Sequence, residues 1–214
     1  MSFESFAEST PANEKTERWK RIEAQVDRIV DRLGLPVDEA IKPLVVALKA
    51  NDFGTTGSCE GHIDNGPAYP WVDIESKLAE SLATDRHYGE LKQKYGKWKA
   101  GIASMAPEDV AAYERLIDTM IRENAVTYRR LLDVLDEFYN VQASARHAPV
   151  VRLTIKRGPW NQSRLEPADI PFDPDGRNLS RSWSEVVKKR RLPAYREEIR
   201  RFADFLKNKY TSSP

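Results

Sequence analysis

The residues best suited to chemistry lie together in the segment Thr55–Glu75. The overlapping run Phe53–Ile63 reads FGTTGSCEGHI and combines three glycines with Ser, Cys, Glu and His. Cys, Glu and His are residue types that bind metals or transfer protons, and glycine lets the backbone bend sharply or approach a ligand closely. No other part of the chain is as dense in such residues, so we expect the functional site here.

The pair Asn65-Gly66 is a strong signal for a two-residue turn between two strands. Because side chains alternate between the two faces of a strand, such a turn predicts one polar face and one apolar face. The polar face would carry Thr56, Ser58, Glu60, His62, Tyr69, Trp71, Asp73 and Glu75. The apolar face would carry Cys59 with Val72 and Ile74, which places the cysteine toward the core.

The polar face could form a pocket that binds a small molecule or nucleotide and that could also be catalytic. Glu60 and His62 are the candidates for proton transfer, and Asp73 would orient His62. The remaining ligand-binding candidates are Thr56, Ser58, Tyr69 and Trp71, of which Trp71 would stack on the ligand.

A metal site is a second interpretation, in which Cys59 and His62 join a carboxylate such as Asp64 or Asp73. This site requires a bulge, because Cys59 and His62 fall on opposite faces of a regular hairpin. No complete zinc motif is present. Two further interpretations treat Cys59 as a small core residue, or as a nucleophile paired with one of the three histidines, His62, His87 and His147.

The segment Phe53–Ile63 resembles the Thr-Thr-x-Ser-Cys-x-Gly-Arg loop of the tRNA wybutosine-synthesizing methyltransferase family, with His62 where that family has arginine. The run Ser-Cys-Glu-Gly-His, followed by Pro-Trp-Val, is more similar still to a motif in uncharacterised bacterial and phage proteins. The first resemblance spans about eleven residues and implies an α+β protein that binds a nucleotide-like ligand around Ser58–His62. The cofactor stays unknown from the sequence.

The basic C-terminal segment offers an alternative function. Residues 1–110 carry 14 Lys/Arg and 19 Asp/Glu, whereas residues 111–214 carry 20 and 14. Arg196, Arg200 and Lys207 can share one face of a helix, where they could contact phosphates or an acidic partner. On this interpretation the chain is a non-enzymatic interaction protein that binds nucleic acid or an acidic protein.

The elements that must position these residues are mostly helical. Apolar residues at spacings of three and four predict helices over Lys15–Leu33, about 41–51, Lys77–Leu82, around Leu91–Trp98, and Pro107–Tyr139. The pattern Ser182-x-x-Glu185 predicts another helix start, and Pro193 can begin a final helix over Ala194–Tyr210. Alternation over Val151–Lys156 predicts a strand, and the proline-rich stretch Gly158–Arg177 is expected to be a long, functional loop.

Together these patterns predict an α+β fold, mostly helical, with a small antiparallel sheet of about three strands covered by helices. The length of 214 residues fits a flexible N-terminus, residues 1–13, followed by a single domain, residues 14–214. No apolar run is long enough for a membrane span, and no signal peptide is recognisable. With a single cysteine, these features predict a cytoplasmic protein.

Overall fold

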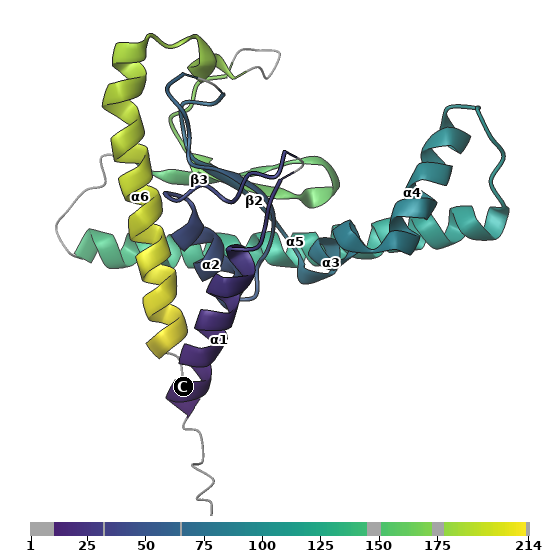
Figure 1. The fold of residues 1–214 in the computed structure, drawn as a ribbon, viewed down its shortest axis with the longest axis horizontal. Helices are drawn as coiled ribbons and strands as arrows, with labels where there is room; N and C mark the ends of the chain where they lie inside the picture. The colour runs from purple at the N-terminus through teal and green to yellow at the C-terminus, as the bar shows by residue number, and fades with distance from the viewer. Residues whose placement is uncertain (1–10, 32, 65, 145–150, 173–177, 213–214) are drawn as a thin grey trace, which may run out of the picture.

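Six α-helices and one antiparallel sheet make up the fold in a computed structural model that describes residues 11–31, 33–64, 66–144, 151–172 and 178–212 (Figure 1). The helices are α1 (Pro11–Val26), α2 (Lys42–Ala50), α3 (Lys77–Thr84), α4 (Arg86–Lys99), α5 (Pro107–Ser144) and α6 (Glu185–Ser212). The strands are β1 (Gly54–Cys59), β2 (Trp71–Glu75), β3 (Leu153–Arg157) and β4 (Ser163–Pro167). One short 3₁₀ helix, η1 (Pro159–Asn161), follows β3, and another, η2 (Leu179–Ser182), precedes α6. The α+β class is therefore confirmed.

The sheet has four strands in the order β1-β2-β4-β3, and each neighbouring pair is antiparallel. The sequence predicted about three strands. It missed β4, which lies inside the stretch that was expected to be a loop. A tight connection joins β3 to β4, in which the Gly158 N–H donates to the Gln162 carbonyl at 2.7 Å. Trp160 and Asn161 both adopt positive φ there, and the amide of Asn161 is anchored to α5 through the Ile121 carbonyl.

One face of the sheet is covered by helices and forms the main core. From the sheet, Val72, Ile74 and Leu165 are fully buried there, and α2, α5 and α6 pack over them. The helices contribute buried residues that include Leu44, Leu48, Leu131, Leu135, Phe202 and Leu206. The opposite face of the sheet carries the polar side chains described below.

Several helix ends differ from the prediction. α1 begins at Pro11 and ends at Val26, so residues 11–13 are helical, and residues 1–10 of the expected flexible N-terminus lie outside the described residues. α6 is continuous through Pro193, and the capping residue is Ser184, whose hydroxyl accepts from the Val187 N–H, rather than Ser182. Ser182 belongs to η2 instead.

Helix α4 and the first half of α5 form an arm that extends away from the sheet (Figure 1). At about 1.5 Å per residue, the 38 residues of α5 span roughly 57 Å, which is far longer than the sheet. The arm has a hydrophobic cluster of its own, built on Tyr88, Leu91 and Tyr113. None of the helices in the described ranges is long and apolar enough to span a bilayer.

Candidate functional site

The pairing of β1 with β2 differs by one residue from the predicted hairpin. Cys59 lies opposite Trp71, and a bulge at Thr56 shifts the register further along the strands. Asn65 of the predicted turn lies outside the described residues, and the strands end well before it, at Cys59 and Trp71. The predicted faces are right for β2, whose Val72 and Ile74 are buried. They are wrong for the end of β1, because a shift of one residue moves its side chains to the other face.

Two predicted residues exchange faces as a result. Ser58 lies opposite the buried Val72, on the helix-covered face, whereas Cys59 shares the open face with Trp71 and Asp73. Directly opposite residues in an antiparallel pair point to the same side of the sheet. Thr56 is placed in the bulge, 3.4 Å from the amide nitrogen of Gln162, and remains on the polar side.

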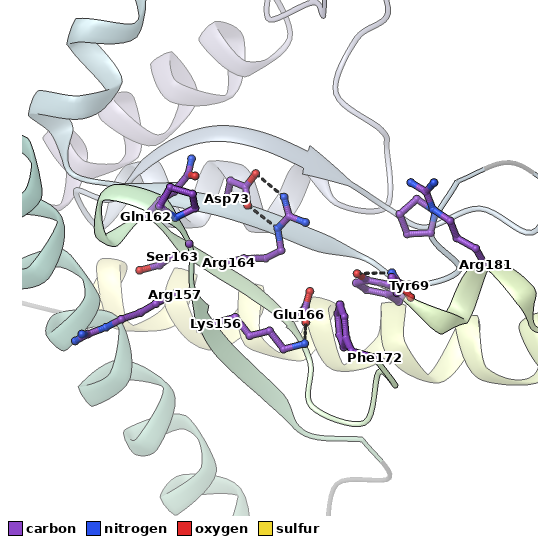
Figure 2. A pocket seen from close by; sticks show the side chains of 14 residues that line it. Tyr69, Asp73, Lys156, Arg157, Gln162, Ser163, Arg164, Glu166, Phe172 and Arg181 are labelled. Carbon is purple, nitrogen blue, oxygen red and sulfur yellow. Dashed lines mark hydrogen bonds and ion pairs between the residues drawn. The ribbon is translucent and has the colours of Figure 1, made fainter. Parts of the chain in front are cut away.

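A row of charged residues crosses the open face from one strand to the next. Asp73 on β2 lies opposite Arg164 on β4, and Arg164 lies opposite Lys156 on β3. Arg164 donates from Nε and Nη2 to the two carboxylate oxygens of Asp73, at 2.7 and 2.8 Å (Figure 2). Its guanidinium also lies 4.1 Å above the ring of Trp71. The pairing with Asp73 raises the pKa of Arg164, which stays cationic.

This arrangement holds the Arg164 guanidinium in one orientation through two of its three nitrogens. In the part of the chain that the structure describes, the third nitrogen, Nη1, has no hydrogen-bond acceptor. A guanidinium that is oriented by a carboxylate and stacked on an aromatic ring has little freedom left to lose on binding an anion. Arg164 is thus a preorganised donor on the open face of the sheet.

A second ion pair lies beside the first. Lys156 Nζ is 2.5 Å from Oε1 of Glu166, whose carboxylate is buried. The same ammonium group lies 3.4 Å from the ring centroid of Phe172, so two partners hold it in place. Because a buried carboxylate is costly without a cation, Glu166 and Lys156 stabilise each other here.

These side chains line a pocket of about 800 Å³ on the open face (Figure 2). The pocket is also lined by Tyr69, Asn178 and Arg181, and Asn178 donates to the Tyr69 hydroxyl at 2.8 Å. Burial raises the pKa of Tyr69, whose phenol therefore stays protonated. Arg181 on η2 has no carboxylate partner among the described residues. Arg157 also lines the pocket, but its guanidinium points away and lies 4.1 Å from the ring centroid of Tyr128 on α5.

Of the predicted ligand-binding residues, Tyr69 lines this pocket and Trp71 lies under Arg164. The guanidinium thus occupies the position over the indole that a stacked ligand was expected to take. Gly57 lies beside the indole, and a Cβ at this position would lie 3.4 Å from both the Trp71 ring and the Asp73 carboxylate. Thr56 and Ser58 do not line the pocket.

The predicted catalytic residues do not form one cluster. Asp73 binds Arg164 and does not orient His62. Glu60 is held in the turn after β1, where its carboxylate accepts from Arg196 Nη2 at 2.7 Å and from the Ala40 N–H at 2.9 Å. His62 lies in the same turn, with Nε2 at 3.7 Å from Oδ2 of Asp38. The catalytic roles of Glu60 and His62 stay predictions.

The two residues of the predicted metal site do come together. The ligand atoms of Cys59 and His62 lie within 4.8 Å of each other and of a carboxylate oxygen of Asp38. The carboxylate that lies beside them is that of Asp38, which precedes α2, and not that of Asp64 or Asp73.

The basic residues of the C-terminal helix have partners within the protein. Arg196 binds the turn after β1, Arg200 is paired with Glu197 and Asp204, and Lys207 lies 5.1 Å from the ring of Trp19. Contact between these three residues and nucleic acid or an acidic partner stays a prediction.

Sequence reasoning missed the residues that β4 and its neighbours bring to the pocket, namely Lys156, Arg164, Glu166, Phe172, Asn178 and Arg181. For Arg164, Glu166 and Phe172 the signal was the length of the stretch Gly158–Arg177, which was expected to be functional; residues 173–177 of it lie outside the described residues.

Comparisons with known proteins identify no relative from which a role for the site could be inferred. No protein-family model, no curated protein and no solved structure matches the chain significantly.

Proposed function

We propose that this protein binds a small molecule carrying a phosphate or carboxylate group, such as a nucleotide, in the pocket on the open face of its sheet. The observation that carries the proposal is the state of Arg164, which is oriented by Asp73 and stacked on Trp71 and whose Nη1 has no acceptor among the described residues. Planar guanidinium groups are well suited to phosphate and carboxylate oxygens.

The rest of the pocket complements such a ligand. Arg181 adds a second cation without a carboxylate partner among the described residues, and Asn178 and Gln162 add side-chain amides to the wall. Phe172 and Tyr69 supply apolar surface, although one face of the Phe172 ring is taken by Lys156. Ligand sites commonly combine a few convergent polar groups with aromatic walls in this way.

Calorimetric titration with three probes at constant ionic strength tests the proposal: a nucleoside 5′-monophosphate, inorganic phosphate and a dicarboxylate. Wild-type protein should bind at least one of them, and Arg164→Met should weaken that binding by about tenfold or more, since a charged hydrogen bond contributes about 1.5–3 kcal/mol. The matched control is Arg152→Met, which removes an arginine that also lies over an aromatic ring, 4.6 Å from Tyr139, but outside the pocket wall.

The probes also separate the ligand classes. Tighter binding of the nucleotide than of inorganic phosphate would identify a nucleotide site, and equal binding would identify a phosphate site. The proposal is wrong if wild-type protein binds none of the three, or if Arg164→Met binds as wild-type does. The nucleotide-like ligand that the resemblance places around Ser58–His62 stays a prediction, separate from this pocket.

A further inference from the structure

Three potential metal ligands converge at the edge of the sheet, where the chain leaves β1 and passes the start of α2. Cys59 is the last residue of β1, and His62 follows three residues later in the turn. Asp38 comes from the segment before α2, where its carbonyl accepts from the N–H groups of Ile41 and Lys42. One ligand atom from each of the three lies within 4.8 Å of the other two.

The donor set is chemically suited to a zinc-like divalent ion. Thiolate, imidazole and carboxylate are the three ligand types that zinc takes from proteins, at about 2.3, 2.0–2.1 and 2.0–2.2 Å. Tetrahedral bonds of this length separate a nitrogen and an oxygen ligand by roughly 3.4 Å. The observed separation of His62 Nε2 and Asp38 Oδ2 is 3.7 Å, so a small contraction would suffice for both to bind one ion.

Backbone groups of the turn hold two of the three ligands in place. The Gly61 N–H donates to Cys59 Sγ at 3.3 Å, and the Glu60 N–H donates to Asp38 Oδ2 at 3.1 Å. Donors of this kind commonly orient the ligands of a metal site. Arg196 fixes the turn itself, since it donates to the carbonyl groups of both Glu60 and Gly61.

Two simpler roles for Cys59 explain less. A nucleophilic cysteine must be accessible to its substrate, whereas Cys59 is buried. A core cysteine would explain its burial, but it would not explain why a histidine and an aspartate converge on the sulfur. A divalent cation between the three groups accounts for all of them.

We propose that Asp38, Cys59 and His62 bind a zinc-like divalent ion. Three protein ligands leave the fourth position of a tetrahedral ion open for water or another small molecule, as in catalytic zinc sites. The proposal does not depend on the anion pocket, because Arg164 and its partners lie outside the three-ligand set.

Titration of the metal-free protein with cobalt(II), followed by absorption spectroscopy, is the test. Wild-type protein should take up about one ion per chain. It should also show a thiolate-to-cobalt charge-transfer band, which reports directly on a bond between Cys59 sulfur and the metal. Cys59→Ser should abolish that band, and His62→Ala and Asp38→Asn should each weaken cobalt binding by about tenfold or more. His87→Ala, in the exposed part of α4, is the matched control and should bind cobalt as wild-type does.

Circular dichroism of each metal-free variant shows whether the variant is folded, so that a loss of cobalt binding can be distinguished from unfolding. Where Cys59→Ser unfolds, the band of the wild-type protein still identifies the sulfur ligand, because Cys59 is the single cysteine of the chain. The proposal is overturned if wild-type protein shows no charge-transfer band at excess cobalt, or if the band persists in a folded Cys59→Ser variant.

Discussion

Arg196 binds Glu60 twice, through its carboxylate and through its backbone carbonyl, and so fastens helix α6 to the turn that follows β1. The guanidinium donates from Nη2 to the carboxylate at 2.7 Å and from Nε to the carbonyl at 3.0 Å, and it also reaches the carbonyl of Gly61. These residues are separated by 136 positions in the chain. The contact therefore makes the placement of the proposed metal ligands depend on α6.

We expect Arg196→Met to lower the free energy of unfolding by about 1–3 kcal/mol, because it leaves three acceptors in the turn without their charged donor. Chemical denaturation followed by circular dichroism measures the change. Arg200→Met is the control, since Arg200 is an exposed residue of the same helix with surface partners, and its loss should cost less than about 0.5 kcal/mol. Equal effects in the two variants would mean that Arg196 does not stabilise the protein through its contacts with the turn.

Gly61→Ala should destabilise the protein by more than about 2 kcal/mol. Gly61 has φ of +79°, and a Cβ there would lie 2.7 Å from the backbone carbon of Tyr69 and 2.8 Å from Leu192. Thermal unfolding provides the measurement. In Gly89→Ala, by contrast, the new Cβ meets nothing within 4 Å in helix α4, and a gain of up to about 1 kcal/mol is expected. A Gly61→Ala variant as stable as wild-type would show that the turn can rearrange.

The ion pair between Asp73 and Arg164 should make the effects of the two substitutions on the free energy of unfolding non-additive. A double-mutant cycle with Asp73→Asn and Arg164→Met should give about 0.5–3 kcal/mol in the free energy of unfolding, since both hydrogen bonds join the same two groups. Asp73→Asn alone should also weaken anion binding, because Arg164 loses its orientation. Coupling near zero would mean that solvent screens the pair.

Glu75 should make stability depend on pH. Burial raises the pKa of this carboxyl, despite its hydrogen bonds to Thr56 and Gln162. The folded state then holds the proton more tightly than the unfolded state. Stability from this group is fully present below the ordinary glutamate pKa of about 4.3, and it is lost as pH rises through the folded pKa.

Glu75→Gln removes this titration and should flatten the decline of stability just above the ordinary glutamate pKa. Urea denaturation at a series of pH values measures the slope. Glu197→Gln is a suitable comparison, because the guanidinium of Arg200 lowers the pKa of Glu197 and the sign of its contribution is opposite. A slope unchanged in Glu75→Gln would contradict the raised pKa.

The sequence predicted the helices and the α+β class well, because their signals are local. The apolar period of α5 and the alternation around Ile155 depend only on neighbouring residues. Strand β4 was missed because only Leu165 in it is a large apolar residue, and Pro167 argued against a strand.

The site could be located only approximately for a similar reason. The turn after β1 is shaped by contacts with Asp38, Ala40 and Arg196, which lie far away in the sequence. Cys59 and His62 could be named as candidate partners from their residue types, whereas their carboxylate neighbour Asp38 could not.

The separate hydrophobic cluster of the arm has a consequence for amide hydrogen exchange. The main core includes Leu131 of helix α5 but, among the described residues, shares no buried residue with the cluster around Tyr88 and Tyr113. The arm can therefore open while the sheet remains closed. Protection should therefore change within a single helix, with fast-exchanging amides near Tyr113 and slow ones from Leu131 onward. One continuous helix would then belong to two cooperative units, and transient opening of the arm would leave the pocket and the proposed metal ligands intact.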